Sequence, residues 1–247
     1  MYNYQGRFFA FGCSFTASDN RPTWADIVGQ QFSEYQNWAR GGMGNQFIFN
    51  QLIEANTRNK FTADDTVIIM WTSTTREDRY AKEMDGWHSG GNIYYSNDVS
   101  AEWLRKFACT RGYLLRDLAT ISATRDLLNF WGVNYKLLSM MPLDQSETHM
   151  SYGDEDVLEL YKDVLADIKP SVYEIIFNLE NWQLKKSNFA PLDNQGFRDA
   201  HPDPVEALEY VQTVLPELII NQTTIDYINN FKFGDAAPEF YLVDRLK

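Results

Sequence analysis

The sequence has few cysteines and histidines and no long apolar run, and each absence excludes a class of protein. Its two cysteines, Cys13 and Cys109, are too few for a disulfide framework, so we expect reduced thiols. Its three histidines are scattered, and no spacing matches a zinc site. We therefore predict no metal and no other cofactor.

Neither a membrane-spanning segment nor a signal peptide is expected from this sequence. No apolar stretch approaches the roughly 20 residues that cross a bilayer. The first residues also lack the basic, apolar and small-residue pattern of a signal peptide. We expect a cytoplasmic protein on these grounds, although the sequence leaves the compartment open.

Basic side chains are scarce relative to acidic ones. The chain carries 22 Lys and Arg against 34 Asp and Glu, for a net charge of −12. Such a surface repels phosphate backbones and anionic lipid headgroups, so neither nucleic acid nor membrane is expected as a partner. Its 247 residues, of which 44% are hydrophobic, are enough for a core. The oligomeric state cannot be read from these features.

Strand patterns alternate with helix patterns along the chain, which is typical of a parallel sheet covered by helices. Asp65–Trp71 is apolar almost throughout, as expected of a strand buried on both faces. Asp203, Pro204 and Glu206 give a strong helix start, as N-cap, N1 and N3 residues. The further expected elements are a helix over 24–32, a strand over 35–39, a long helix from the Ser100 cap to Gly132, a strand over 134–141 and a helix from Asp154 to Ile168.

We predict a single α/β domain over 1–247, a three-layer α/β/α sandwich with a mainly parallel central sheet of the flavodoxin-like kind. Residues 80–97 show no clear periodicity and follow a strand end, which indicates a lid inserted at 79–99. The last thirty residues are expected to form a helical extension at about 217–247. Val172–Phe177 is ambiguous between strand and helix.

Arg7–Thr16 is the stretch that points most directly to chemistry. It is an apolar strand that ends at Gly12 and then presents Ser14. Polar side chains that follow a parallel strand collect at the edge of the sheet where ligands bind. A nucleophilic serine there needs a base, an orienting carboxylate and donors for an oxyanion.

Two loops supply residues of the required kinds. Arg40–Asn45 is rich in glycine, but it completes no phosphate-binding pattern, so it indicates a backbone that approaches a ligand closely. His201 follows Asp199 by two residues and lies in a loop just before the helix start at Asp203. A carboxylate beside an imidazole fixes its tautomer and stabilises its charged form. A surface histidine near a helix cap is the alternative reading of that loop.

Taken in chain order, these segments resemble the SGNH (GDSL-like) hydrolase superfamily over nearly the whole chain. Gly12–Thr16 resembles the first block, which carries the nucleophile. Asn37–Gly42 resembles the second block, which supplies an oxyanion donor. Asp199–Pro202 resembles the last block, although its Asp-to-His spacing is one residue shorter than the commonest form.

The resemblance implies a Ser14, His201 and Asp199 triad and an oxyanion hole built from the amides of Ser14 and Gly42. The third block of the family normally supplies an asparagine, which is missing here, because the strand runs Trp71-Thr72-Ser73-Thr74. Ser73 would occupy that place, or Asn45 would substitute from the neighbouring loop. Loss of one oxyanion donor costs on the order of 10²–10³ in rate.

The implied reaction is the hydrolysis of an O-acetyl or short-chain acyl ester through an acyl-enzyme. A carbohydrate substrate is suggested by lid aromatics such as Trp87, and Trp71 is a further predicted substrate contact. Arg76 either orients the substrate or forms a surface ion pair. Two alternatives remain open: an O-acyltransferase on the same triad, and a non-catalytic carbohydrate-binding or structural protein that keeps the fold.

Overall fold

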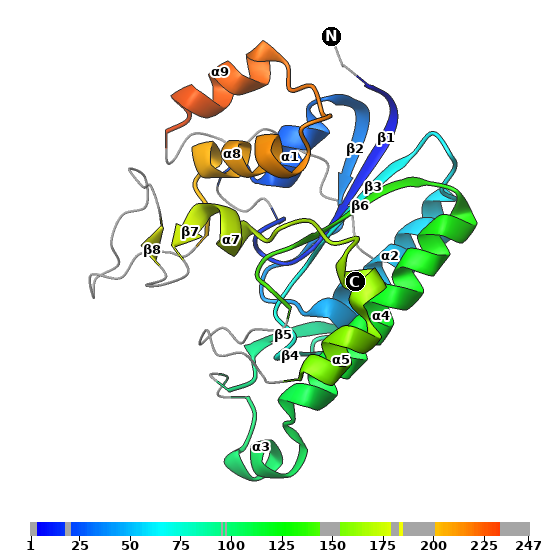
Figure 1. The fold of residues 1–247 in the computed structure, drawn as a ribbon, viewed down its shortest axis with the longest axis vertical. Helices are drawn as coiled ribbons and strands as arrows, with labels where there is room; N and C mark the ends of the chain where they lie inside the picture. Colours follow the sequence, from blue (N-terminus) through cyan, green and yellow to red (C-terminus); the bar gives the residue numbers. More distant parts are fainter. Residues whose placement is uncertain are drawn as a thin grey trace.

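A four-stranded parallel sheet forms the centre of the computed structural model (Figure 1), in the order β2-β1-β3-β6. A parallel bridge between Leu137 and Ile168 extends the pairing beyond β6. The structure describes residues 4–17, 21–94, 96, 98–143, 154–178, 183–184 and 201–232. The sheet strands are β1 (Tyr4–Phe11), β2 (Phe32–Asn37), β3 (Thr66–Trp71) and β6 (Asn134–Ser139).

Alternating side chains of β1 divide the core into two halves. Phe8 and Ala10 pack into one hydrophobic cluster, and Phe9 and Phe11 pack into another on the opposite face of the sheet. All four are fully buried. Because both faces of the strand are covered, its sequence is a continuous apolar run rather than an alternating one.

Helices cover both faces of the sheet (Figure 1), which confirms the predicted three-layer fold class. On one side lie α1 (Trp24–Gly29), α7 (Val172–Ile176), α8 (Pro204–Val214) and α9 (Gln222–Asn230). On the other side lie α2 (Asn45–Asn59), α4 (Thr110–Trp131), α5 (Glu155–Leu160) and α6 (Lys162–Leu165). The strand order with β1 between β2 and β3 is the flavodoxin-like one.

The predicted helix from Ser100 to Gly132 is two helices. Ser100 Oγ accepts a hydrogen bond from the Trp103 amide at 3.1 Å, and it caps the short helix α3 (Ala101–Phe107). The chain is extended at Ala108 and re-enters a helix as α4, which ends at Gly132 in the left-handed conformation. Because α3 buries no residue, no core contact keeps it in line with α4.

The region expected to be an aperiodic lid contains a hairpin. Strand β4 (Arg76–Ala81) pairs antiparallel with β5 (Gly86–Asn92). No strand pattern is visible in this part of the sequence, because β4 carries charged residues on both faces and β5 is rich in glycine. That this segment acts as a lid stays a prediction.

Other boundaries differ modestly from those expected. Phe32 begins β2 instead of ending the preceding helix, and the helix expected over 154–168 is interrupted at Tyr161. Val172–Ile176 is helical, and it leads into the two-residue strands β7 (Phe177–Asn178) and β8 (Gln183–Leu184). Helix α9 supplies the helical part of the C-terminal extension, whereas 233–247 lies outside the described residues.

Candidate active site

The turn after β1 is tight, and it carries Ser14. The amides of Thr16 and Ala17 both donate to the carbonyl oxygen of Cys13, at 3.0 and 2.9 Å. A Cβ on Gly12 would lie 2.1 Å from Thr16 Oγ1, far inside contact distance. Glycine at this position therefore allows the turn to close directly against the end of the strand.

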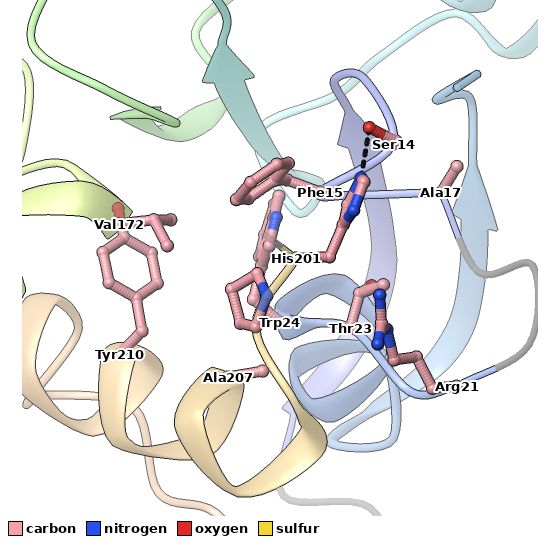
Figure 2. A pocket seen from close by; sticks show the side chains of 11 residues that line it. Ser14, Phe15, Ala17, Arg21, Thr23, Trp24, Val172, His201, Ala207 and Tyr210 are labelled. Atoms are coloured by element: carbon pink, nitrogen blue, oxygen red, sulfur yellow. Dashed lines mark hydrogen bonds between the residues drawn. The ribbon is translucent and has the colours of Figure 1, made fainter. Parts of the chain in front are cut away.

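Ser14 and His201 meet at the carboxyl edge of the sheet. Ser14 Oγ lies 2.7 Å from His201 Nε2, although 187 positions separate the two residues (Figure 2). The imidazole packs against the ring of Phe15, with ring centroids 4.7 Å apart. This is the distance and arrangement that a nucleophile and its general base require.

The N-terminal cap of helix α8 holds the backbone that directly follows His201. The Asp203 carboxylate accepts from the Glu206 amide at 2.8 Å, and the Glu206 carboxylate accepts from the Asp203 amide at 2.8 Å. This reciprocal cap is the one predicted from the sequence. Asp203 is thus occupied as a cap, and the predicted orienting residue Asp199 lies outside the described residues.

The glycine-rich loop runs beside the serine turn. The Arg40 amide donates to the Gly12 carbonyl oxygen at 3.3 Å, and Asn37 Nδ2 donates to the Thr16 carbonyl oxygen at 2.8 Å. Gly42 has φ +76°, a left-handed backbone that favours glycine. Its added Cβ would also lie 3.0 Å from Ser89 Cβ, so β5 covers this loop closely.

Asn45 holds the end of β3 rather than facing a ligand. It is fully buried, and its Nδ2 donates to the Thr72 carbonyl oxygen at 3.0 Å and to Asp117 Oδ2 at 2.7 Å. Its Oδ1 accepts from the Thr72 amide at 2.8 Å. Both amide hydrogens are therefore used, and neither is left for the oxyanion role considered from the sequence.

Ser73 follows Thr72, which is held by the buried clamp of Asn45 and Asp117. It is buried, and its hydroxyl lies 2.9 Å from Thr75 Oγ1. The Arg116 guanidinium donates to the carbonyl oxygens of Thr74 at 3.2 Å and Arg76 at 3.1 Å. The loop that carries Ser73 is thus held from α4.

Asp117 is a buried acid that the sequence did not single out. Arg116 Nε donates to its Oδ1 at 2.6 Å. Burial raises the pKa of Asp117 to about 6, against the lowering effects of Arg116 and of the hydrogen bond from Asn45. Within α4 it occupies a charged position on a mostly apolar buried face, which is a signal that could have identified it from the sequence.

The three residues predicted to contact the substrate make contacts within the protein. Arg76 Nη1 donates to the Met43 carbonyl oxygen at 3.0 Å. Trp71 is fully buried in the core, and Trp87 packs edge-on against Phe47 at 5.8 Å between ring centroids. These contacts join the hairpin to the core, and the burial of Trp71 leaves it no surface for a substrate.

A cavity of about 170 Å³ opens beside Ser14 and His201 on the opposite side, toward α1 and α8 (Figure 2). No pattern in the sequence places these side chains together, since they come from four separate segments. The lining residues are Ser14, Phe15, Ala17, Arg21, Thr23, Trp24, Val172, His201, Pro202, Ala207 and Tyr210.

Among the described residues, no group of three or more His, Cys, Asp or Glu side chains is arranged to hold a metal ion. In the same part of the chain, every helix is too short or too polar to traverse a bilayer.

No protein-family model matches the sequence, and no curated protein matches it. Solved structures do match. A GDSL-like lipase from Bacteroides thetaiotaomicron is 11% identical, with 87% of each chain covered and a TM-score of 0.43. A putative acylhydrolase from Bacteroides fragilis is 12% identical, with 91% of this chain and 88% of that chain covered and a TM-score of 0.44. The esterase EstA from Pseudoalteromonas sp. is 11% identical, with 86% and 97% covered and a TM-score of 0.44.

Proposed function

We propose that this protein is a serine ester hydrolase of the SGNH (GDSL-like) type that acts on O-acetyl or short-chain acyl esters. The observation that carries the proposal is the 2.7 Å approach of Ser14 Oγ to His201 Nε2 at the carboxyl edge of a parallel sheet. The motif order supports it, because the serine turn, the glycine-rich loop and the histidine loop follow one another as in that superfamily.

The reaction proceeds in two steps. The Ser14 hydroxyl gives its proton to His201 Nε2 as its oxygen bonds to the ester carbonyl carbon. His201 then passes that proton to the departing alcohol as the carbon–oxygen bond breaks, which leaves an acyl-enzyme. Water, deprotonated by His201, attacks the acyl-enzyme and releases the acid and the free serine.

The remaining roles in this proposal are assigned from the resemblance of the sequence blocks to that superfamily. The amides of Ser14 and Gly42 face the developing oxyanion, and Ser73 is the candidate third donor. Asp199 orients His201, as the last sequence block implies. A carbohydrate as the alcohol part is suggested by the aromatic and polar side chains of the hairpin, among them the partly buried Trp87.

The test is turnover of p-nitrophenyl butyrate, together with labelling by a fluorophosphonate. We expect Ser14→Ala to abolish labelling and to lower kcat by 10³-fold or more, and His201→Ala to lower kcat by on the order of 10³. Ser33→Ala and His88→Asn are the matched controls. Ser33 binds the Gly6 carbonyl oxygen, and His88 pairs with Asp98 at 2.9 Å on the exposed hairpin.

Equal turnover in wild type and Ser14→Ala would refute the assignment of the nucleophile. A folded wild-type protein that neither turns over esters nor reacts with the probe would favour the non-catalytic alternative. Product analysis with a polyol acceptor separates hydrolysis from acyl transfer, since hydrolysis releases only the free acid.

A further inference from the structure

The cavity beside Ser14 is built from side chains of the turn after β1 and of α1, α7 and α8 (Figure 2). Phe15, Trp24, Val172, Ala207 and Tyr210 form its large apolar side, and each is at least nine-tenths buried. Ala207 and Tyr210 are three residues apart on α8 and therefore share the helix face that looks into the cavity. The reacting serine lies at one end of this wall.

Three polar groups of the wall are already satisfied inside the protein. Trp24 Nε1 donates to Thr16 Oγ1 at 3.1 Å, and the Tyr210 hydroxyl donates to the Pro170 carbonyl oxygen at 3.1 Å. The Thr23 hydroxyl donates to the Thr16 carbonyl oxygen at 3.0 Å. These three groups therefore turn carbon toward the cavity, and the polar part of its lining includes Ser14, His201 and Arg21. Because Arg21 is buried and already has an interaction partner inside the protein, the cavity favours an uncharged occupant.

The volume limits how large that occupant is. An apolar protein cavity of about 150 Å³ holds one benzene molecule, which has six carbon atoms. The cavity here, of about 170 Å³, is slightly larger. It therefore encloses a chain of about four to six carbons, and the further carbons of a longer chain extend beyond this volume.

We propose that this cavity is the acyl-binding pocket of the esterase and that it selects neutral acyl chains of about four to six carbons, with Ala207 setting the length. The inference rests on the proposed function. It places the acyl chain between α1, α7 and α8, so the alcohol leaves on the opposite side, where the glycine-rich loop and the hairpin lie.

The experiment measures kcat/KM for p-nitrophenyl acetate, butyrate, hexanoate, octanoate and dodecanoate. A buried methylene is worth about fourfold, so wild type should gain on the order of 100-fold from acetate to hexanoate and then gain no further with longer chains. Ala207→Leu fills the cavity, and it should lower hexanoate turnover at least tenfold while changing acetate turnover less than twofold.

Val172→Ile is a second, smaller filling, and it should move the preferred chain length down by about one carbon. Val205→Leu is the matched control, because Val205 lies on α8 but is 37% exposed and does not line the cavity. It should leave the length profile unchanged.

Different results would overturn different statements. A flat length profile, an equal loss on every ester in Ala207→Leu, or a preference for glutarate monoesters over butyrate would reject the neutral acyl pocket while Ser14-dependent hydrolysis stands. Absence of Ser14-dependent hydrolysis at every chain length would reject the proposed function, and this inference with it.

Discussion

At the scale of single residues, the site depends on a few positions where one atom too many would not fit. Gly12 is the sharpest case, since the space of its missing side chain is filled by Thr16. Thr16 in turn accepts hydrogen bonds from Trp24, Thr23 and Asn37 through its side chain or carbonyl oxygen. A change at Gly12 is therefore transmitted to the turn that carries Ser14.

We predict that Gly12→Ala lowers the free energy of unfolding by about 1–3 kcal/mol, because the new Cβ overlaps Thr16. The turn must shift to relieve this overlap, so Ser14-dependent turnover should fall as well. Urea unfolding and p-nitrophenyl butyrate turnover measure the two effects.

Gly112→Ala serves as the control for this substitution. Gly112 is exposed in α4, and its added Cβ would lie no closer than 3.6 Å to another residue. Alanine should stabilise that helix by roughly 0.5–1 kcal/mol. Equal stability of Gly12→Ala and wild type would show that the turn tolerates the extra carbon.

At the scale of elements, helix α8 serves both the cavity and the histidine. Its first turn is fixed by the Asp203 and Glu206 cap, two residues after His201. Its inner face packs against α1, and Ala207 and Tyr210 line the cavity. The start of this helix therefore sets where the imidazole lies relative to Ser14.

Asp203→Ala should destabilise the protein by about 1 kcal/mol, the usual cost of an N-cap lost to alanine. Because the cap lies close to His201, kcat should fall more than the loss of stability explains. Asp203→Asn keeps a good capping side chain, so its thermal midpoint and kcat should stay near those of wild type. If both variants behaved alike, the effect would come from the charge of Asp203 rather than from its cap.

At the scale of the whole molecule, α4 ties together the two loops on the far side of Ser14. Asp117 binds Asn45, which in turn binds both backbone groups of Thr72. Arg116 binds the carbonyl oxygens of Thr74 and Arg76. One helix thus fixes the ends of β3 and of the glycine-rich loop.

The clamp of Asn45 and Asp117 makes the free energy of unfolding depend on pH. Because burial raises the pKa of Asp117 from 3.8 to about 6, the native protein holds this proton more tightly than the unfolded chain between those pH values. The contribution of Asp117 to stability is therefore largest below pH 3.8 and is lost as the pH rises to about 6. A shift of this size corresponds to about 3 kcal/mol.

Urea unfolding of wild type and Asp117→Asn at pH 4, 5, 6 and 7.5 isolates this contribution. Relative to the variant, wild type should lose stability between pH 4 and pH 6 and show a constant difference above it. The nearby Asp78, whose pKa is also raised by burial, is present in both proteins, and its charge contributes to the raised pKa of Asp117, so the measured difference includes the coupling of the two carboxyls. A pH-independent difference would contradict the assignment.

Sequence alone determined the features that depend on neighbours along the chain. The apolar run ending at Gly12, the cap at Asp203 and the left-handed end of α4 at Gly132 were all predicted, because strand patterns and caps are encoded within a few residues. The hairpin β4–β5 was missed because its pairing is carried by backbone groups and not by an apolar pattern.

Only the tertiary structure decided what depends on packing between distant segments. It brought Ser14 to His201 across 187 positions, and it used both amide hydrogens of Asn45 in a buried clamp. It also opened the cavity between α1, α7 and α8. No local pattern encodes these arrangements, because each is set by how both faces of the sheet are covered.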